Sequence, residues 1–257
     1  MRRSLVLVFL LAPFAIAQEG RKGVNFYSLE QEVALGRQLA REFQRDVTAL
    51  ESRAASEYID GIGRRLVARA GGPPFTYTFT LVTGDRNFVH SAAAFPGGFL
   101  FVPASLILAA RDEDEFAGML AQAIAHVAAR DYTRQATRAE LLHAPSTSWR
   151  LAASDAQNGA IPLALLHMWR KCELDADRLA ARAMSAVGYN PKALARYIDR
   201  EQAPYDEHSA ATFSPLPRRA QRAAVIEAVI KELPAQVYPP HEGLAKIQEE
   251  VRRSTAP

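Results

Sequence analysis

Residues 116–129 of this chain form a segment that carries no charge. The sequence FAGMLAQAIAHVAA runs for fourteen residues without Asp, Glu, Lys or Arg, in a chain of which 23% is charged. Gln122 and His126 are its only strongly polar residues, and they are four positions apart. On a helix this spacing puts both side chains on one side, one turn apart. The segment therefore predicts a helix over residues 113–130 that presents one polar pair.

The whole chain has the composition of a folded domain. It has 257 residues, of which 49% are hydrophobic, so it can bury a sizeable core. Cys172 is the only cysteine, which excludes an intramolecular disulfide. We take it as a packing thiol.

The N-terminus has the pattern of an export signal. Arg2 and Arg3 precede an apolar stretch at residues 5–16, and the sequence AIA at residues 15–17 is a small-x-small cleavage site. We expect residues 1–17 to be a signal peptide that delivers the protein to the periplasm or the extracellular space. The alternative is an uncleaved N-terminal membrane anchor.

Removal of residues 1–17 also changes the charge balance. The remaining chain has 29 basic and 28 acidic residues, so the apparent basicity belongs largely to the signal. We expect no binding to nucleic acid and no transmembrane helix in the mature chain.

Local patterns predict an α+β fold that is mainly helical, with a small sheet. A capping box at Ser28 opens the first helix, an alternating strand covers residues 75–82, and a hairpin around Pro96 covers residues 89–103. We expect a single domain over residues 18–257, without a C-terminal repeat domain. The remaining segments are predicted to be helices at 29–46, 50–69, 104–110, 113–130, 132–143, 160–187, 191–202, 217–232 and 242–253, with loops at 144–159 and 203–216.

The polar pair of the uncharged segment has the spacing of the zinc-binding motif H-E-x-x-H. The five positions 122–126 read QAIAH. The second histidine of the motif is therefore present as His126, whereas Gln122 and Ala123 stand at the positions of the first histidine and the glutamate.

Several segments together resemble the gluzincin metallopeptidase family that contains the CAAX prenyl endopeptidase and periplasmic outer-membrane quality-control proteases. Each segment is short, but all occur in the family's order and together they span most of residues 25–225. They are NFYSLEQE at 25–32, FPGGFLFV at 95–102, the helix at 113–130 with its continuation TRQAT at 133–137, ELDAD at 173–177 and AVGYNP at 186–191.

The resemblance implies a zincin-like metallopeptidase fold with an altered site. His126 occupies the second zinc-ligand position and Glu173 the third, and Asp177 would orient a histidine ligand. Gln122 is a poor substitute for a histidine ligand, and one lost ligand weakens zinc affinity by roughly a hundredfold. Ala123 cannot act as the general base, whose loss typically costs about 10²–10⁴ in rate. We therefore expect zinc to be weakly bound or absent.

Two further positions depart from the family pattern. Asp131 stands where relatives often have a histidine after the zinc helix, and Phe213 stands where a later loop often has another. Arg219 matches the arginine that follows this loop in relatives.

Structural interpretations remain open beside these functional ones. His126 can be an ordinary buried, hydrogen-bonded histidine, and Glu173 and Asp177 can form ion pairs with nearby arginines, the candidates being Arg170, Arg178 and Arg182. A basic stripe at 130, 134 and 138 is most simply a solvated helix face; the alternative is a site for an acidic partner or lipid headgroups.

The leading hypothesis is an exported, catalytically degenerate metalloendopeptidase that serves envelope protein quality control by binding polypeptide. One alternative is an active zinc metalloendopeptidase with an altered metal site. A second is a regulatory partner of an active protease relative. The expected partner is a substrate or client polypeptide in the first two cases.

Overall fold

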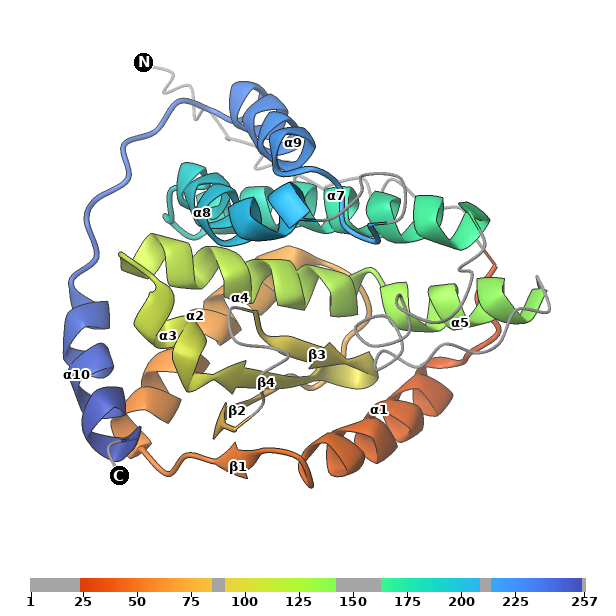
Figure 1. Cartoon of the computed structure of the whole chain (residues 1–257), viewed down its shortest axis with the longest axis horizontal. Helices are drawn as coiled ribbons and strands as arrows, with labels where there is room; N and C mark the ends of the chain where they lie inside the picture. Colours follow the sequence, from red (N-terminus) through yellow and green to blue (C-terminus); the bar gives the residue numbers. More distant parts are fainter. Residues whose placement is uncertain (1–23, 85–90, 142–162, 209–213, 256–257) are drawn as a thin grey trace, which may run out of the picture.

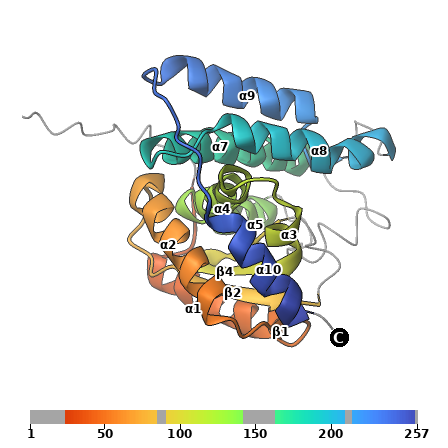
Figure 2. The same ribbon diagram turned by 90° about the vertical axis from the view of Figure 1, so that its left-hand side faces the viewer.

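The computed structural model describes residues 24–84, 91–141, 163–208 and 214–255. Helices dominate these residues, and one small four-stranded sheet accompanies them, which confirms the predicted mainly helical α+β class. The elements form layers (Figures 1 and 2): α4 (Glu113–Ala128) lies between the sheet and the pair α7 (Leu163–Ala186) and α8 (Lys192–His208). Helix α9 (Arg219–Glu232) packs on the outer side of that pair.

The sheet has the strand order β1-β2-β4-β3. Strand β2 (Thr78–Thr83) runs parallel to β4 (Phe99–Pro103), and β3 (Ala93–Phe95) pairs antiparallel with β4. The hairpin is thus confirmed over its described part. Strand β2 begins three residues after the predicted start at 75, because its partner β4 begins only opposite Thr78. The two-residue strand β1 (Thr48–Ala49) was not predicted.

Helix α1 (Leu29–Phe43) lies against the hairpin turn, a 3₁₀ segment at Pro96–Gly98. It begins with the predicted capping box, in which the Ser28 hydroxyl accepts from the Gln31 N–H and the Gln31 side chain accepts from the Ser28 N–H. Gly36 makes the close packing possible: a Cβ there would lie 1.7 Å from the Pro96 carbonyl oxygen. Helix α2 (Arg53–Ala70) follows, close to its predicted bounds.

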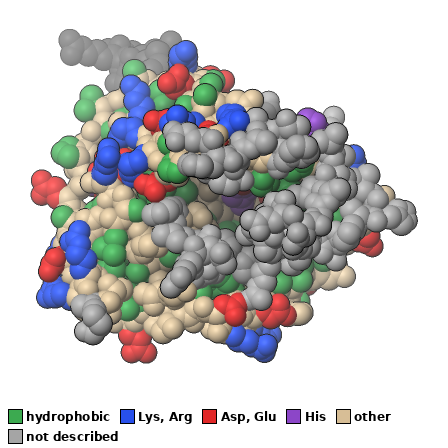
Figure 3. Space-filling model, in the orientation of Figure 1, with side chains coloured by type: hydrophobic (Ala, Val, Ile, Leu, Met, Phe, Trp, Pro, Cys, Tyr) green, Lys and Arg blue, Asp and Glu red, His purple; other side chains and the backbone are tan. Residues whose placement is uncertain are grey.

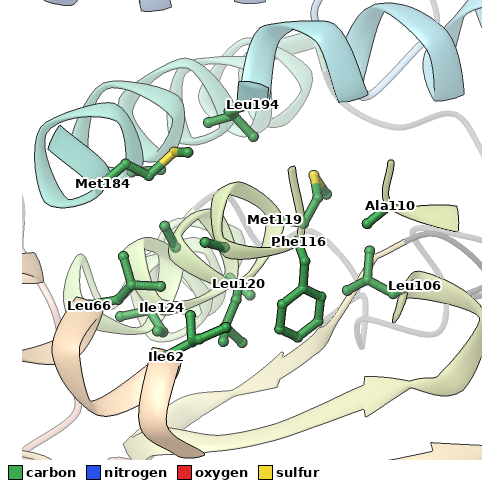
Figure 4. Close-up of a cluster of buried hydrophobic side chains, with 14 of the residues drawn as sticks. Ile62, Leu66, Leu106, Ala110, Phe116, Met119, Leu120, Ile124, Met184 and Leu194 are labelled. Atoms are coloured by element: carbon green, nitrogen blue, oxygen red, sulfur yellow. The ribbon is translucent and has the colours of Figure 1, made fainter. Parts of the chain in front are cut away.

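Helix α4 is the centre of the hydrophobic core. Asp112 caps it by accepting from the Glu115 N–H at 2.8 Å. Nearly every residue of the helix is buried, as expected for a helix that is apolar on all sides. Its side chains meet α2, α3 (Ala104–Ala109), α7 and α8 (Figure 4). Gly118 lets α8 approach, because a Cβ there would already lie 3.0 Å from that of Leu194.

The helix predicted over 113–130 ends at Ala128, and α5 (Asp131–Leu141) begins as a separate helix. Arg130 lies between them with φ +58°, a left-handed backbone that is uncommon outside glycine. This break interrupts the basic stripe that the sequence predicted. The Arg130 side chain is also only partly exposed: its guanidinium binds the buried Glu32 carboxylate and the Tyr27 carbonyl oxygen.

Helix α8 continues to His208, so the prediction of a loop from residue 203 was wrong. Pro204 lies inside this helix, and the segment after residue 213 supports its last turns through side-chain hydrogen bonds. Gln202 donates to the Pro217 carbonyl oxygen at 2.6 Å, and Arg218 donates to the Asp206 carbonyl oxygen at 2.6 Å. The predicted loop at 144–159 lies outside the described residues.

The C-terminal helix α10 (Gly243–Thr255) packs on α2 and α3. No helix in the described ranges is long and apolar enough to cross a bilayer. Residues 1–17, the predicted signal peptide, lie outside those ranges. On the face shown in Figure 3, basic and acidic side chains are intermixed.

Candidate functional site

Helices α4 and α7 bring Gln122, His126 and Glu173 together. Gln122 Nε2 donates to Glu173 Oε2 at 3.0 Å and lies 3.2 Å from His126 Nε2. His126 Nε2 lies 3.4 Å from Glu173 Oε1. Gln122 is buried, and the side chains of His126 and Glu173 are 22% and 21% exposed. The two family ligand positions are thus adjacent, as the resemblance implied, and they contact each other directly.

Asp131 is the carboxylate that orients His126. The His126 Nδ1–H donates to Asp131 Oδ2 at 2.9 Å, and Asp131 is only 4% exposed. The left-handed turn at Arg130 brings the first residue of α5 back toward the end of α4. The sequence identified Asp131 only as a departure from the family pattern and assigned the orienting role to Asp177.

Asp177 instead binds Arg222, a residue that the sequence did not single out. Arg222 donates from Nε and Nη2 to the two Asp177 oxygens at 2.8 and 2.7 Å, and both side chains are buried. The same guanidinium reaches Glu173 Oε2 at 3.7 Å and Gln202 Oε1 at 3.3 Å. One signal was available: Arg222 shares the buried stripe of α9 with Ile226 and Val229, at spacing i, i+4, i+7.

The other arginines considered in the sequence lie elsewhere. Arg219 pairs with Asp199 and Asp206 near the surface, so the arginine at the site is Arg222 and not Arg219. Asp177 does form an ion pair, as the structural interpretation expected, but its partner is Arg222. Arg170 donates to the Ser214 carbonyl oxygen, Arg178 pairs with Asp175, and Arg182 pairs with Glu232. Phe213 lies outside the described residues.

The surroundings of His126 and Glu173 favour the charged form of each side chain. Burial by itself would lower the pKa of His126, but Glu173 and Asp131 outweigh it and raise that pKa to about 10. Burial would likewise raise the pKa of Glu173, but His126 and Arg222 lower it to about 2. Burial raises the pKa of Asp177 despite the contact with Arg222. His126 and Glu173 are therefore an ion pair at neutral pH.

The residues present do not fit a catalytic zinc ion. A zinc site needs three good protein ligands, and this site offers one imidazole, one carboxylate and one amide. Both ring nitrogens of His126 are engaged by carboxylates, and a guanidinium lies 3.7 Å from Glu173. In the parts of the chain that are described, no group of three or more His, Cys, Asp or Glu side chains is placed to hold a metal.

Ala123 is buried. It is 3% exposed and belongs to the main cluster of buried side chains. A methyl group neither accepts nor donates a proton, so this position contributes no general base. The described residues of the site can form a salt-bridge network. Position 123 supplies no group that could activate a nucleophile.

Comparison with known proteins identifies a matching family and several similar relatives. The profile described as Peptidase family M48 matches residues 53–230. The chain is 29% identical over 222 residues to a Vibrio cholerae serotype O1 protein named "Putative beta-barrel assembly-enhancing protease", which covers 77% of this chain and 45% of that protein. It is 27% identical over 188 residues to the Beta-barrel assembly-enhancing protease of Yersinia pestis, covering 67% of this chain and 38% of that protein. The Escherichia coli K12 protein of the same name is 25% identical over 203 residues, covering 72% and 41%. The chain spans less than half the length of these relatives.

Proposed function

The chain belongs to peptidase family M48, and from this premise we propose that it is an exported pseudoprotease that binds polypeptide without hydrolysing it. The family is zinc-dependent. In this chain the positions that would supply the first ligand and the general base are Gln122 and Ala123.

The observation that carries the proposal is the direct contact among the remaining site residues. Gln122 and His126 bond to Glu173, and Arg222 adds a positive charge beside it. An imidazolium and a guanidinium thus compensate the carboxylates where relatives would use a metal. We propose that zinc is bound weakly or not at all, and that the network maintains the fold.

The binding role is supported by the sheet. Among the described strands, β3 pairs with β4 alone and is therefore an edge strand. An extended polypeptide can add to such an edge through main-chain hydrogen bonds. The names of the relatives refer to beta-barrel assembly, so the proposed client is an unfolded envelope protein, met in the periplasm after export by residues 1–17.

Restoring the missing groups tests the proposal. The double variant Gln122→His/Ala123→Glu should gain chelator-sensitive cleavage of casein, whereas the wild-type protein should show none. The control Gln122→His/Ala123→Gln has the same shape but no base, and its rate should be lower by about 10²–10⁴. Cleavage by the wild-type protein that a chelator and His126→Ala both abolish would establish the altered active peptidase instead.

Hydrogen exchange tests the binding role. Addition of reduced, unfolded casein to the wild-type protein should slow exchange of the amides in β3 (Ala93–Phe95). Unchanged exchange throughout the chain in the presence of a large molar excess of casein would contradict polypeptide binding. Protection confined to other elements would contradict the proposed edge.

A further inference from the structure

Residues 24–28 lie against α5 and are hydrogen-bonded to it. The Asn25 side chain donates to Thr133 Oγ1 at 2.9 Å, the Phe26 N–H donates to Thr137 Oγ1 at 3.0 Å, and Arg130 donates to the Tyr27 carbonyl oxygen. Figure 1 shows this segment beside α5, in red, at the edge of the molecule.

This corner carries most of the exposed apolar side chains. Four large hydrophobic residues are exposed in the described part of the chain, and three of them lie here. Val24 is 67%, Phe26 50% and Leu141 49% exposed. Leu141 is one helical turn beyond Thr137, to which the Phe26 N–H is bonded, so Phe26 and Leu141 are neighbours at this corner. The fourth, Val237, lies between α9 and α10.

Basic residues border this patch. Arg134, Arg138 and Leu141 follow the spacing i, i+4, i+7 and so share one side of α5, on which Arg138 is exposed. In the sequence, Arg21 and Lys22 precede Val24 almost directly. Helix α5 has two acidic residues, and Asp131 is turned inward to His126, which leaves Glu140 as the outward one. Cations thus accompany exposed apolar side chains at this corner.

From this combination we infer that the corner formed by residues 24–28 and the C-terminal half of α5 binds the surface of an anionic lipid bilayer. Apolar side chains enter the interface of a bilayer while arginines contact anionic headgroups, each cation contributing about 1 kcal/mol. The apolar stretch at residues 5–16 is joined to this corner by residues 17–23, which extend at most ~25 Å. The corner is therefore close to the membrane in the uncleaved precursor, in which that stretch is inserted. This inference does not depend on whether the site is catalytic.

Vesicle sedimentation tests the inference on protein that an expression host has exported and processed. The probes are vesicles of phosphatidylglycerol with phosphatidylethanolamine, and vesicles of phosphatidylcholine alone. The variant Phe26→Ser/Leu141→Ser should bind the anionic vesicles at least about tenfold more weakly than wild type. Arg138→Gln should weaken binding about fivefold and reduce its salt dependence.

Val237→Ser is the control, because it removes an apolar side chain that is even more exposed from another place. It should bind as wild type does. Circular dichroism and thermal unfolding should be unchanged in all variants, since the Phe26 hydrogen bond uses its backbone. Failure of the wild-type protein to prefer anionic vesicles, or equal binding by all variants, would overturn the inference. So would a dimer in solution that Phe26→Ser/Leu141→Ser dissociates, because the patch would then be a contact between two copies.

Discussion

At the scale of single residues, Arg222 supplies the buried positive charge of the site. Its side chain is buried with Asp177, bonds to both carboxylate oxygens and lies beside Glu173. A buried ion pair is costly to break on one side only, because the remaining charge loses its compensation.

Replacement of Arg222 therefore has a large expected effect on stability. Arg222→Met should lower the free energy of unfolding by about 3–5 kcal/mol, and Arg222→Met/Asp177→Leu should recover most of that loss. Arg219→Met is the control, and its exposed ion pair with Asp199 should contribute no more than about 1 kcal/mol. Urea unfolding measures all three. Equal losses for the Arg222 and Arg219 variants would contradict the role of the buried pair.

The contact of His126 with Glu173 and Asp131 predicts a dependence of stability on pH. The folded-state pKa of His126, raised to about 10, lies above the value of about 6.5 in an unfolded chain. The folded state then binds more protons than the unfolded state between these values, so the free energy of unfolding falls as pH rises through this window. The stabilisation is complete below about pH 6.5.

Urea unfolding at several pH values between 7 and 9.5 measures this slope. The variant His126→Gln should lose most of it, because no group titrates at that position. A wild-type slope that equals the slope of the variant would show that the imidazole is neutral in the folded protein.

At the scale of elements, the packing of α1 on the hairpin depends on one missing side chain. Gly36→Ala would put a methyl group 1.7 Å from the Pro96 carbonyl oxygen, so the helix or the turn must shift. Overpacking of this kind costs about 1–3 kcal/mol.

Gly61 in α2 gives the matched control, because a Cβ there would meet nothing within 4 Å. Gly61→Ala should stabilise the protein by about 0.5–1 kcal/mol through helix propensity. Thermal unfolding of both variants would show opposite shifts in Tm. Shifts of the same sign would contradict the close approach of α1 to the turn.

The elements themselves were mostly predictable from local sequence. The capping box at Ser28 and the hairpin around Pro96 depend on neighbouring residues, and both are present. The start of β2 and the end of α8 were not predictable, since each depends on a partner elsewhere in the chain. The boundary between α4 and α5 was predicted near residue 131, but the left-handed backbone of Arg130 was not, because it has no local signal and its side chain is bound by Glu32, 98 residues away.

At the scale of the whole molecule, the proposal predicts a fold that is independent of metal. Neither a chelator nor excess zinc should change the Tm of the wild-type protein, because the network compensates its own charges. The variant Gln122→His/Ala123→Glu should gain stability with zinc, by about 2.7 kcal/mol at a hundredfold excess over Kd. In a chain of this size that is a rise in Tm of roughly 5–10 °C.

Calorimetry with and without a chelator measures both shifts. The control Gln122→His/Ala123→Gln should bind zinc equally well, since it restores the same ligand. A chelator-induced fall in the wild-type Tm would mean that the native site holds a metal and would contradict the proposal.

By itself, the sequence determined the helix around residues 116–129, the pairing of Gln122 with His126 on one side of it, and the family. These follow from the periodicity of neighbouring residues, which the backbone of a helix converts directly into a shared face. Only the tertiary structure decided what that face contacts. Asp131 reaches His126 because of the turn at Arg130, and Arg222 reaches Asp177 because α9 packs on α7. Such contacts depend on how separate elements pack together, and no spacing along the chain encodes that.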